Sequence, residues 1–194
     1  MSERRLAWET RYREGRTAWD RGDASPALAH WLGHEKAPRG RVLVPGCGNG
    51  HEVAELVQSG LQVTAVDIAA QPVMQLTGQL VEQGLHARIV QADLLQWQPA
   101  EPFDAVYEQT CVCALEPSTW SAYERRLADW LLPGGILYAL FMQTGQQGGP
   151  PYDCPVPRMR GLFDATRWDW LDEPPLHVAH PNGLHEEGFI LVRR

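Results

Sequence analysis

The sequence predicts an α/β fold, in which a mostly parallel sheet of seven strands carries helices on both faces. Three observations support this prediction. Short apolar runs alternate with longer helix-like segments, and this alternation is typical of βαβ units. A glycine-rich turn directly follows the first apolar run. Acidic residues stand at the ends of several apolar runs, so they should meet at one edge of a parallel sheet.

The first half of the chain is expected to form three strands separated by two helices. A strand at 41–45 leads into a helix at about 50–59, which Gly60 ends. A second strand covers about 61–67. The second helix opens at Gln71-Pro72, where proline loses no hydrogen bond, and closes at Gly84. A third strand at about 86–91 follows.

The second half is expected to complete the sheet. A strand at about 103–108 precedes a helix with Ser118 as N-cap, which runs through Leu131 and ends at Pro133-Gly134-Gly135. A strand at 136–142 leads into a loop, 144–157, rich in glycine and proline. A short helix and two more strands, the last at about 188–193, are expected to follow.

Length and charge limit the possible partners. The 194 residues fit one domain, 1–194. The net charge of −7 argues against nucleic acid or a membrane surface as a partner. The apolar runs are shorter than the roughly 20 residues of a membrane span, and no apolar signal core follows Met1. We therefore expect a cytoplasmic protein that acts on a small molecule.

The cysteines and histidines indicate no metal site by their spacing. Cys47, Cys111, Cys113 and Cys154 form no Cys-x-x-Cys pair, and Cys111 and Cys113 are expected to be small buried apolar residues. His177, His180 and His185 have no nearby cysteine and no helical His-x3-His spacing. We expect these histidines to lie at the surface or to face substrate, where one could serve as a base.

The glycine turn distinguishes between nucleotide ligands. The dinucleotide fingerprint is Gly-x-Gly-x-x-Gly, whereas this chain has Gly46-x-Gly48-x-Gly50, with His51 at the place of the third glycine. No Walker-type phosphate loop occurs in the chain. A Gly-x-Gly-x-Gly turn after a strand is the pattern of methyltransferases that use S-adenosylmethionine (SAM). A nicotinamide oxidoreductase is thereby disfavoured, and an ordinary loop that binds nothing is the simpler alternative.

Acids at three strand ends support the ligand-binding interpretation. Asp67 ends the second strand, where an acid can accept hydrogen bonds from two ribose hydroxyls. Asp93 follows the third strand, and Glu108 ends the fourth. The carboxyl ends of the strands are where open α/β sheets bind ligands.

The first 40 residues stand outside the alternating pattern. Trp8, Tyr12, Trp19 and Trp31 lie in an otherwise polar segment. These four aromatic residues fit two interpretations equally well: they pack on the core, or they form a lid over a bound ligand. The lid interpretation rests on the attraction of tryptophan faces for a cation such as a sulfonium, which amounts to about 0.5–2 kcal/mol.

Several motifs resemble the thiopurine S-methyltransferase family, which includes bacterial thiopurine and tellurite-detoxifying enzymes and plant thiol/halide methyltransferases. They are Trp8-x3-Tyr12-x2-Gly15-x-Thr17-x-Trp19-Asp20-x-Gly22 with Ser25-Pro26, Val44-Pro45-Gly46-Cys47-Gly48, Cys113-Ala114-Leu115-Glu116-Pro117 and Gly148-Gly149-Pro150-Pro151-Tyr152. The resemblance spans roughly residues 8–192. It implies a Rossmann-like class I methyltransferase fold with an N-terminal helical lid over residues 1–40, SAM as cofactor, and a monomer.

The resemblance also implies roles for individual residues. Trp8, Tyr12 and Trp19 match the aromatic segment that folds over the cofactor, and Gly46 matches the glycine loop. Asp67 matches the acid that holds the ribose, whereas Asp93 and Leu94 match the pair beside the adenine. Gln109 aligns near the methionyl moiety, at a position where thiopurine-metabolising vertebrate members have arginine. This departure from the family pattern counts against a preference for purine thiolates.

The expected reaction is transfer of a methyl group to a small thiol or another soft nucleophile. Such an in-line displacement gains from a water-poor pocket and needs no strong general base when the acceptor is an anion. Tyr152 and Trp19 are expected to shape the acceptor pocket, with the Tyr152 hydroxyl orienting the acceptor or a water. A SAM-binding sensor or assembly subunit without catalysis is the alternative from a different class.

Overall fold

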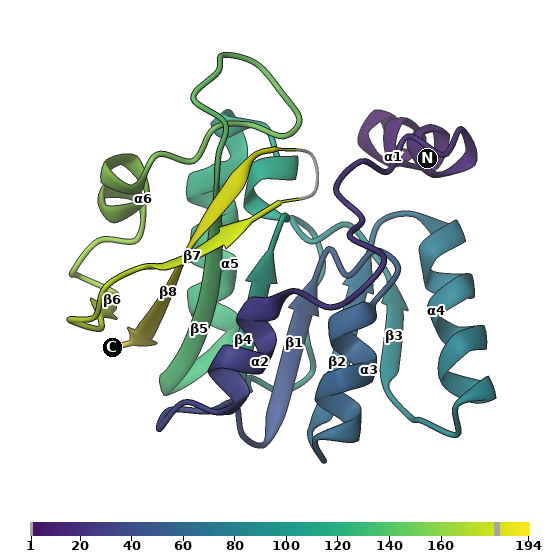
Figure 1. Ribbon diagram of the computed structural model, residues 1–194, viewed down its shortest axis with the longest axis horizontal. Coiled ribbons are helices and arrows are strands. Elements are labelled where there is room, and N and C mark those ends of the chain that lie inside the picture. Colours follow the sequence, from purple (N-terminus) through teal and green to yellow (C-terminus); the bar gives the residue numbers. More distant parts are fainter. Residues whose placement is uncertain (1, 181–182) are drawn as a thin grey trace.

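A single sheet runs through the molecule between two layers of helices (Figure 1). The computed structural model describes residues 2–180 and 183–194. In that part of the chain the strands are β1 (Arg41–Pro45), β2 (Gln62–Asp67), β3 (Arg88–Gln91), β4 (Phe103–Gln109), β5 (Leu131–Gln143), β6 (Trp168–Trp170), β7 (Leu176–Ala179) and β8 (His185–Arg193). Their order is β3-β2-β1-β4-β5-β8-β6, and β7 also pairs with β8.

The sheet is parallel in its first five strands and antiparallel beyond them. β1 pairs with β2 and β4, β2 with β3, and β4 with β5, all in parallel. β8 is antiparallel to β5, β6 and β7. The strand order reverses between β1 and β4. At such a reversal, an open α/β sheet forms the crevice in which ligands bind.

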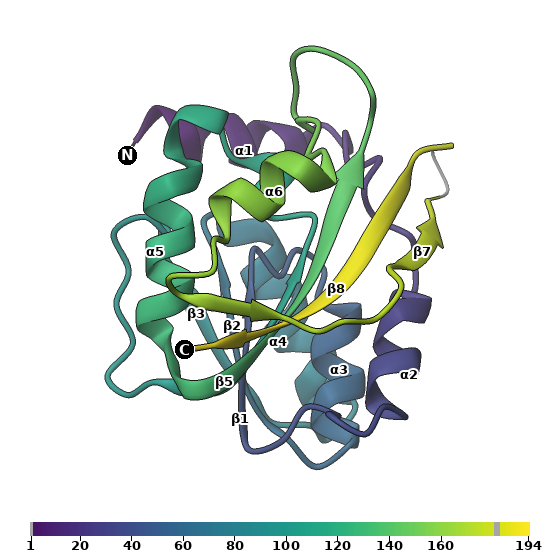
Figure 2. The same ribbon diagram turned by 90° about the vertical axis from the view of Figure 1, so that its left-hand side faces the viewer.

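Helices cover both faces of the sheet, as predicted (Figure 2). The buried cluster on one face includes residues of α2 (Pro26–Leu32), α3 (His51–Gln58) and α4 (Ala70–Glu82), and that on the other face includes residues of α5 (Trp120–Trp130) and α6 (Val156–Leu162). Two 3-10 turns, η1 (Val112–Ala114) and η2 (Pro117–Thr119), join β4 to α5. The remaining helix, α1 (Glu3–Arg13), lies across the carboxyl ends of the parallel strands (Figure 1).

The apolar run of β1 is explained by burial on both faces. Leu43 belongs to the cluster that includes α5 and α6, whereas Val42 and Val44 belong to the cluster that includes α2, α3 and α4. Successive side chains of a strand point to opposite faces. A central parallel strand therefore reads as a continuous apolar segment rather than an alternating one.

The C-terminal third differs in detail from the prediction. Its described residues bring the sheet to eight strands rather than seven, because two short strands, β6 and β7, both pair with β8. The helix expected to run from Ser118 to Leu131 begins at Trp120 after η2 and ends at Trp130. The helix thus ends one residue before the expected position. Pro133-Gly134-Gly135 itself lies within β5, where Leu131 pairs with Phe103 and Ile136 with Ala105, so this segment forms an irregularity in the strand.

The N-terminal aromatic residues divide into two groups. Trp31, on α2, is 2% exposed and packs against Tyr107 and Tyr138 of the sheet. Trp8 and Trp19 are only partly buried and lie above the strand ends. Trp31 therefore belongs to the core, whereas the other two belong to the crevice. Among the helices that the structure describes, none combines the length and apolar character needed to cross a bilayer.

Candidate active site

The glycine turn after β1 depends on backbone angles that glycine adopts readily. Gly46, Gly48 and Gly50 have φ values of 61°, 50° and 73°, in the left-handed region that disfavours other residues. A Cβ on Gly50 would lie 2.4 Å from Leu76 of α4, and one on Gly46 would lie 2.9 Å from the Cys111 sulfur. The turn therefore lets α3 begin against α4 and brings the backbone close to the segment after β4.

Asp67 is fixed at the end of β2 by two backbone donors. Its Oδ2 accepts a hydrogen bond from the Gly48 N–H at 3.0 Å, and its Oδ1 accepts one from the Ala69 N–H at 2.9 Å. The residue is 6% exposed. Burial raises the pKa of Asp67 to about 6, although the backbone donors oppose this shift. A carboxylate held in this way keeps oxygen lone pairs for further donors.

Asp20 ties the N-terminal segment to the glycine turn. Its Oδ1 lies 2.9 Å from His51 Nε2, and its Oδ2 accepts a hydrogen bond from the Asn49 side chain. Burial opposes ionisation, but the hydrogen bonds from the Gly22 N–H, His51 and Asn49 lower the pKa of Asp20. His51, which replaces the third glycine of a dinucleotide site, thus has a structural partner in the N-terminal segment.

Further contacts dock α1 on the strand ends. Arg4 Nη1 donates to both carboxylate oxygens of Asp93, at 2.8 and 3.0 Å. Glu9 Oε1 accepts a hydrogen bond from the Ala70 N–H, at the start of α4, at 2.8 Å. A carboxylate at a helix N-terminus is favourably placed. The segment before β1 is therefore held by polar contacts at the tips of β2 and β3 as well as at the glycine turn.

Trp19 forms edge-to-face pairs with the two other aromatic residues of the segment. Its ring centroid lies 5.4 Å from that of Trp8 and 5.6 Å from that of Tyr12, with interplanar angles of 80° and 84°. Such pairs hold rings in a defined orientation. Trp19 lines all three cavities of this region, so this ring separates one binding space from the next.

The first of these spaces, the inner cavity, measures about 70 Å³. It lies between α1 and the ends of β1, β2 and β4, and it contains carboxylates, aromatic rings and apolar side chains. Its lining consists of Arg4, Trp8, Tyr12, Trp19, Gly46, Asp67, Ile68, Asp93, Leu94, Thr110, Cys111, Ala114 and Leu115.

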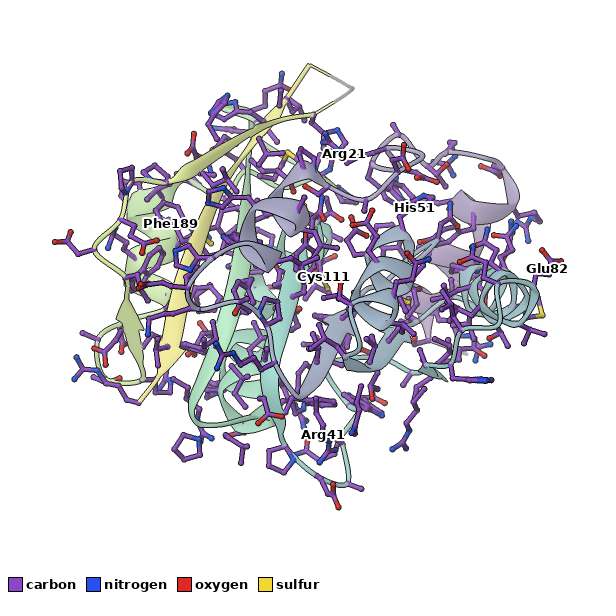
Figure 3. The ribbon with its side chains drawn as sticks, turned by 60° about the horizontal axis from the view of Figure 1, so that its bottom comes forward. Arg21, Arg41, His51, Glu82, Cys111 and Phe189 are labelled. Carbon is purple, nitrogen blue, oxygen red and sulfur yellow. The ribbon has the colours of Figure 1, made fainter. Side chains whose placement is uncertain are left out.

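The second space, the glycine-turn cavity, continues from the inner cavity along the Gly46–His51 segment. Arg21, His51 and Gln109 all line it, and Arg21 and His51 are labelled in Figure 3. Arg21 Nη1 is buried and has no hydrogen-bond partner among the described residues. A buried guanidinium donor without an acceptor is unfavourable, so Arg21 is available to a carboxylate, although Asp20, Asp23 and Glu52 also line this cavity.

The third space, the outer cavity, lies on the other side of Trp8 and Trp19 and measures about 300 Å³. Its walls are mostly apolar, and Arg11 and Arg16 are its charged residues. The complete lining is Trp8, Arg11, Arg16, Ala18, Trp19, Thr110, Cys113, Ala114, Met142, Pro150 and Pro151.

Most residues predicted from the sequence lie together. The inner cavity is lined by Trp8, Tyr12, Trp19, Gly46, Asp67, Asp93 and Leu94. Gln109 lines the adjacent glycine-turn cavity. Tyr152 lies outside all three spaces, in a surface groove beside Trp8 and Arg11. Its backbone N–H donates to the Cys113 carbonyl at 2.7 Å, which holds the loop of Pro150 and Pro151 against the segment after β4.

Sequence reasoning missed several residues that line these cavities. Arg4, Arg11, Arg16 and Arg21 belong to a segment in which exposed arginines are ordinary, so their identity alone carries no signal. Thr110 follows β4 and lines all three spaces. Its φ of 55° is uncommon for a β-branched residue, and backbone strain of this kind clusters at functional sites.

Two buried carboxyl groups lie near the site without lining these spaces. Burial raises the pKa of Glu108 to about 8, while the Val112 N–H donates to its Oε1 at 2.6 Å. Burial likewise raises the pKa of Glu186 to about 8, although the charge of Arg21 opposes the shift. Both groups are therefore mainly protonated at neutral pH. Cys111 and Cys113 are buried, as predicted, and all four cysteines are free.

The architecture is that of class I SAM-dependent methyltransferases. A solved structure of the Burkholderia thailandensis 1,6-didemethyltoxoflavin-N1-methyltransferase, with bound S-adenosylhomocysteine, superposes with a TM-score of 0.79. The alignment covers 97% of this chain and 86% of that one, at 23% sequence identity. At this low sequence identity, the superposition establishes the shared fold and nothing further.

The chain belongs to the thiopurine S-methyltransferase family, whose profile matches residues 4–177. It is 33% identical to thiocyanate methyltransferase 1 of Brassica oleracea over 93% of this chain and 82% of that protein. It is 30% identical to the thiopurine S-methyltransferase of Pseudomonas putida over 96% of this chain and 95% of that protein. The protein is therefore a SAM-dependent methyltransferase.

The residues of the site fit this cofactor. SAM carries a ribose, an adenine, a sulfonium and an amino-acid carboxylate. The inner cavity offers a buried carboxylate in Asp67 and aromatic faces in Trp8 and Trp19. The glycine-turn cavity offers the unpaired guanidinium donor of Arg21 to a carboxylate. The sulfonium and the carboxylate of the cofactor thus each have a group of suitable chemistry among the lining residues.

Proposed function

We propose that this enzyme transfers the methyl group of SAM to a small thiolate or a similarly soft anion held in the outer cavity. One observation carries the proposal: Trp8, Trp19, Thr110 and Ala114 line both the inner and the outer cavity. A group in either cavity therefore borders the other. The two cavities differ in charge, because two carboxylates and Arg4 line the inner one, whereas the described lining of the outer one has two arginines and no carboxylate.

The inner cavity would hold the adenosine part of the cofactor. Asp67 would accept hydrogen bonds from the ribose hydroxyls, since its oxygens keep free lone pairs beside the Gly48 and Ala69 donors. Asp93 would accept from the adenine amine, replacing Arg4 at one oxygen, while Leu94 packs on the ring. Tyr12 and Gly46 would close this cavity above and below.

The glycine-turn cavity would hold the amino-acid part of the cofactor. Arg21 would donate to the carboxylate, which satisfies the donor that lacks an acceptor among the described residues. Gln109 lines the same cavity, and its amide donates to Glu186 Oε2 at 3.4 Å. Glu186 is mainly protonated, as its raised pKa indicates, so it adds little negative charge next to the bound carboxylate.

The lining of the outer cavity selects the acceptor. Met142, Pro150 and Pro151 provide an apolar wall, while Arg11 and Arg16 attract negative charge. Among the described lining residues there is no Asp, Glu or His side chain to remove a proton. The acceptor should therefore arrive as an anion with a polarisable, weakly hydrated nucleophilic atom. Two relatives of this chain are named for the methylation of sulfur-containing acceptors, thiocyanate and a thiopurine.

Bound SAM supplies an electrophilic methyl group on a cationic sulfur. The rings of Trp8 and Trp19, which line the inner cavity, would stabilise that cation by about 0.5–2 kcal/mol each. They also exclude water, which favours an anionic nucleophile by weakening its hydration. Arg11 and Arg16 keep the acceptor in the outer cavity, so that the two reactants are aligned. Tyr152 supports this arrangement through the loop that it anchors, and an acceptor-orienting role for its hydroxyl stays a prediction.

The experiment is S-adenosylhomocysteine release from SAM across an acceptor panel of sulfide, alkyl and aryl thiols, a thiopurine, thiocyanate, iodide, selenite and tellurite. We expect turnover with thiols or soft anions that Asp67→Ala abolishes at low SAM concentration. Measurable SAM binding without turnover on any acceptor would contradict the proposal and would favour a SAM-binding sensor or assembly subunit.

We further propose that the whole chain acts as one catalytic domain, as a cytoplasmic monomer that does not bind nucleic acid. The acidic balance of −7 supports the last point, because nucleic acid favours a basic face. Light scattering after size-exclusion chromatography should give the mass of one chain, and a mass of two chains would contradict the monomer.

A further inference from the structure

The antiparallel pairing of β7 and β8 brings together three residues that are separate in the sequence. His177 on β7 pairs in register with Glu187 on β8. His185 precedes Glu187 by two positions on the same strand, and side chains two apart in a strand share a face. The pairing therefore places two imidazoles and one carboxylate on one face of the sheet.

The ligand atoms lie at distances that suit a metal ion. His177 Nδ1 is 2.9 Å and His185 Nε2 is 3.6 Å from Glu187 Oε1. One ligand atom from each of the three residues lies within 4.8 Å of the other two. Around a tetrahedral Zn²⁺ with bonds of about 2.0–2.2 Å, neighbouring ligand atoms lie about 3.4 Å apart. The two short separations lie on either side of this value.

From this geometry we propose that His177, His185 and Glu187 bind a divalent late transition metal, of which Zn²⁺ is the best fit. Two imidazole nitrogens and a carboxylate oxygen form a ligand set that Zn²⁺ favours. The His177 and His185 side chains are 61% and 41% exposed, whereas that of Glu187 is 18% exposed. An ion can therefore enter from solvent, and a water can complete the coordination.

This metal site is separate from the active site. None of its three residues lines the inner, glycine-turn or outer cavity. Glu186, between His185 and Glu187, points to the opposite face of the strand, where it meets Gln109. The ion would join β7 to β8 and so stabilise the strand pair that carries Glu186 behind the site. The proposal does not depend on the identity of the methyl acceptor.

The test is calorimetric titration of ZnCl2 into the chelator-treated full chain, with thermal unfolding measured in parallel. We expect one ion per chain and a melting temperature that rises with free Zn²⁺, because a ligand of the folded state stabilises it. His185→Ala and, separately, His177→Ala should each weaken binding by at least about 100-fold, since even the outer partners of metal ligands contribute about 10–100-fold.

The matched control is His86→Ala, which removes an exposed histidine just before β3 and should leave Zn²⁺ affinity unchanged. Circular dichroism of each variant verifies folding, and Co²⁺ loaded in place of Zn²⁺ should give the visible absorption of tetrahedral coordination, lost in both site variants. Absence of binding, or binding that His177→Ala and His185→Ala leave intact, would overturn the proposal and would identify the cluster as an ordinary ion-pair group.

Discussion

The inner and outer cavities share the rings of Trp8 and Trp19 but are built differently. The inner cavity takes its polar groups from strand ends, where Asp67 is held by two backbone N–H groups and Asp93 by Arg4 and a backbone donor. The outer cavity takes its charged groups from arginines in and after α1, and its apolar wall from Met142 and the loop after β5. In the function we propose, the groups that would hold the cofactor thus come mainly from the sheet, whereas those that would select the acceptor come from helix and loop side chains.

Trp19→Ala removes part of the wall that the inner and outer cavities share and should have the largest effect. We expect kcat/KM to fall by about 100-fold, because cation–π stabilisation and the exclusion of water are lost together. Trp31→Ala is the matched control. Since Trp31 lies in the core, its truncation should cost about 3–5 kcal/mol of stability and leave activity per folded molecule intact. Chemical denaturation and steady-state kinetics separate the two outcomes, and the reverse pattern would assign Trp19 to the core.

Asp67→Ala should weaken binding of the cofactor and leave binding of the acceptor unchanged. We expect S-adenosylhomocysteine to bind about 1.5–3 kcal/mol more weakly, which is the usual loss for hydrogen bonds to a charged group. The control is Asp104→Ala at the amino end of β4, where the carboxylate accepts a hydrogen bond from the Arg41 N–H at 2.7 Å. Calorimetry should show unchanged affinity for that variant. Equal affinity in both variants would remove the ribose assignment.

Arg21→Met tests the assignment of the cofactor carboxylate. S-adenosylhomocysteine should bind about 10-fold more weakly, because a charge-assisted hydrogen bond is lost. The affinity of 5′-methylthioadenosine, which lacks the amino-acid part, should not change. A similar loss for both ligands would mean that Arg21 acts on the adenosine part or on the fold.

The pH dependence of cofactor binding sharpens the role of Asp67. The pKa of about 6 in the free protein should fall when ribose hydroxyls donate to the ionised carboxylate, so the complex binds fewer protons than the free enzyme. Affinity should therefore rise with pH up to about 6 and level off above it, with a change of up to about 10-fold per pH unit below that value. Calorimetry of Asp67→Asn should give a flat profile, and a flat profile in the unaltered protein would contradict the account.

Arg16→Gln should have the smallest effect, and it should alter binding of the acceptor rather than of the cofactor. Arg16 is exposed and pairs with Glu14 at 2.7 Å, and exposed charges contribute about 0.2–1 kcal/mol. We expect KM for an anionic acceptor to rise by up to about 5-fold, with KM for SAM unchanged. Arg13→Gln, also exposed but outside the outer cavity, should alter neither constant. If Arg16→Gln changed KM for SAM but not KM for the acceptor, the charge of Arg16 would act on cofactor binding instead.

Sequence reasoning predicted the parts of the fold and site that local chemistry specifies. The Gly46–Gly50 turn and the acid at Asp67 are interpretable because few other structures require that pattern. The pairing of the C-terminal strands was not predicted in detail, because β6 and β7 are three and four residues long and carry little periodicity. Pro133-Gly134-Gly135 indicated the end of a helix. In the structure this segment is part of β5, because the residues on both sides of it pair with β4.

The residues that sequence reasoning missed depend on contacts between distant segments. The role of Asp20 depends on its contact with His51, 31 positions away. The role of Arg4 depends on its contact with Asp93, 89 positions away. The cluster of His177, His185 and Glu187 likewise arises from strand pairing, which residue spacing does not reveal. Tyr152, placed by motif in the acceptor pocket, lies in the groove beside it.

The most direct test of the division between the cavities is a two-substrate kinetic measurement of S-adenosylhomocysteine formation from SAM and an aryl thiol. It would compare the unaltered enzyme with Asp67→Ala and with the combined Arg11→Gln, Arg16→Gln variant. We predict that Asp67→Ala raises KM for SAM and leaves KM for the thiol unchanged, and that the arginine variant raises KM for the thiol and leaves KM for SAM unchanged. A rise of both constants in both variants would contradict it.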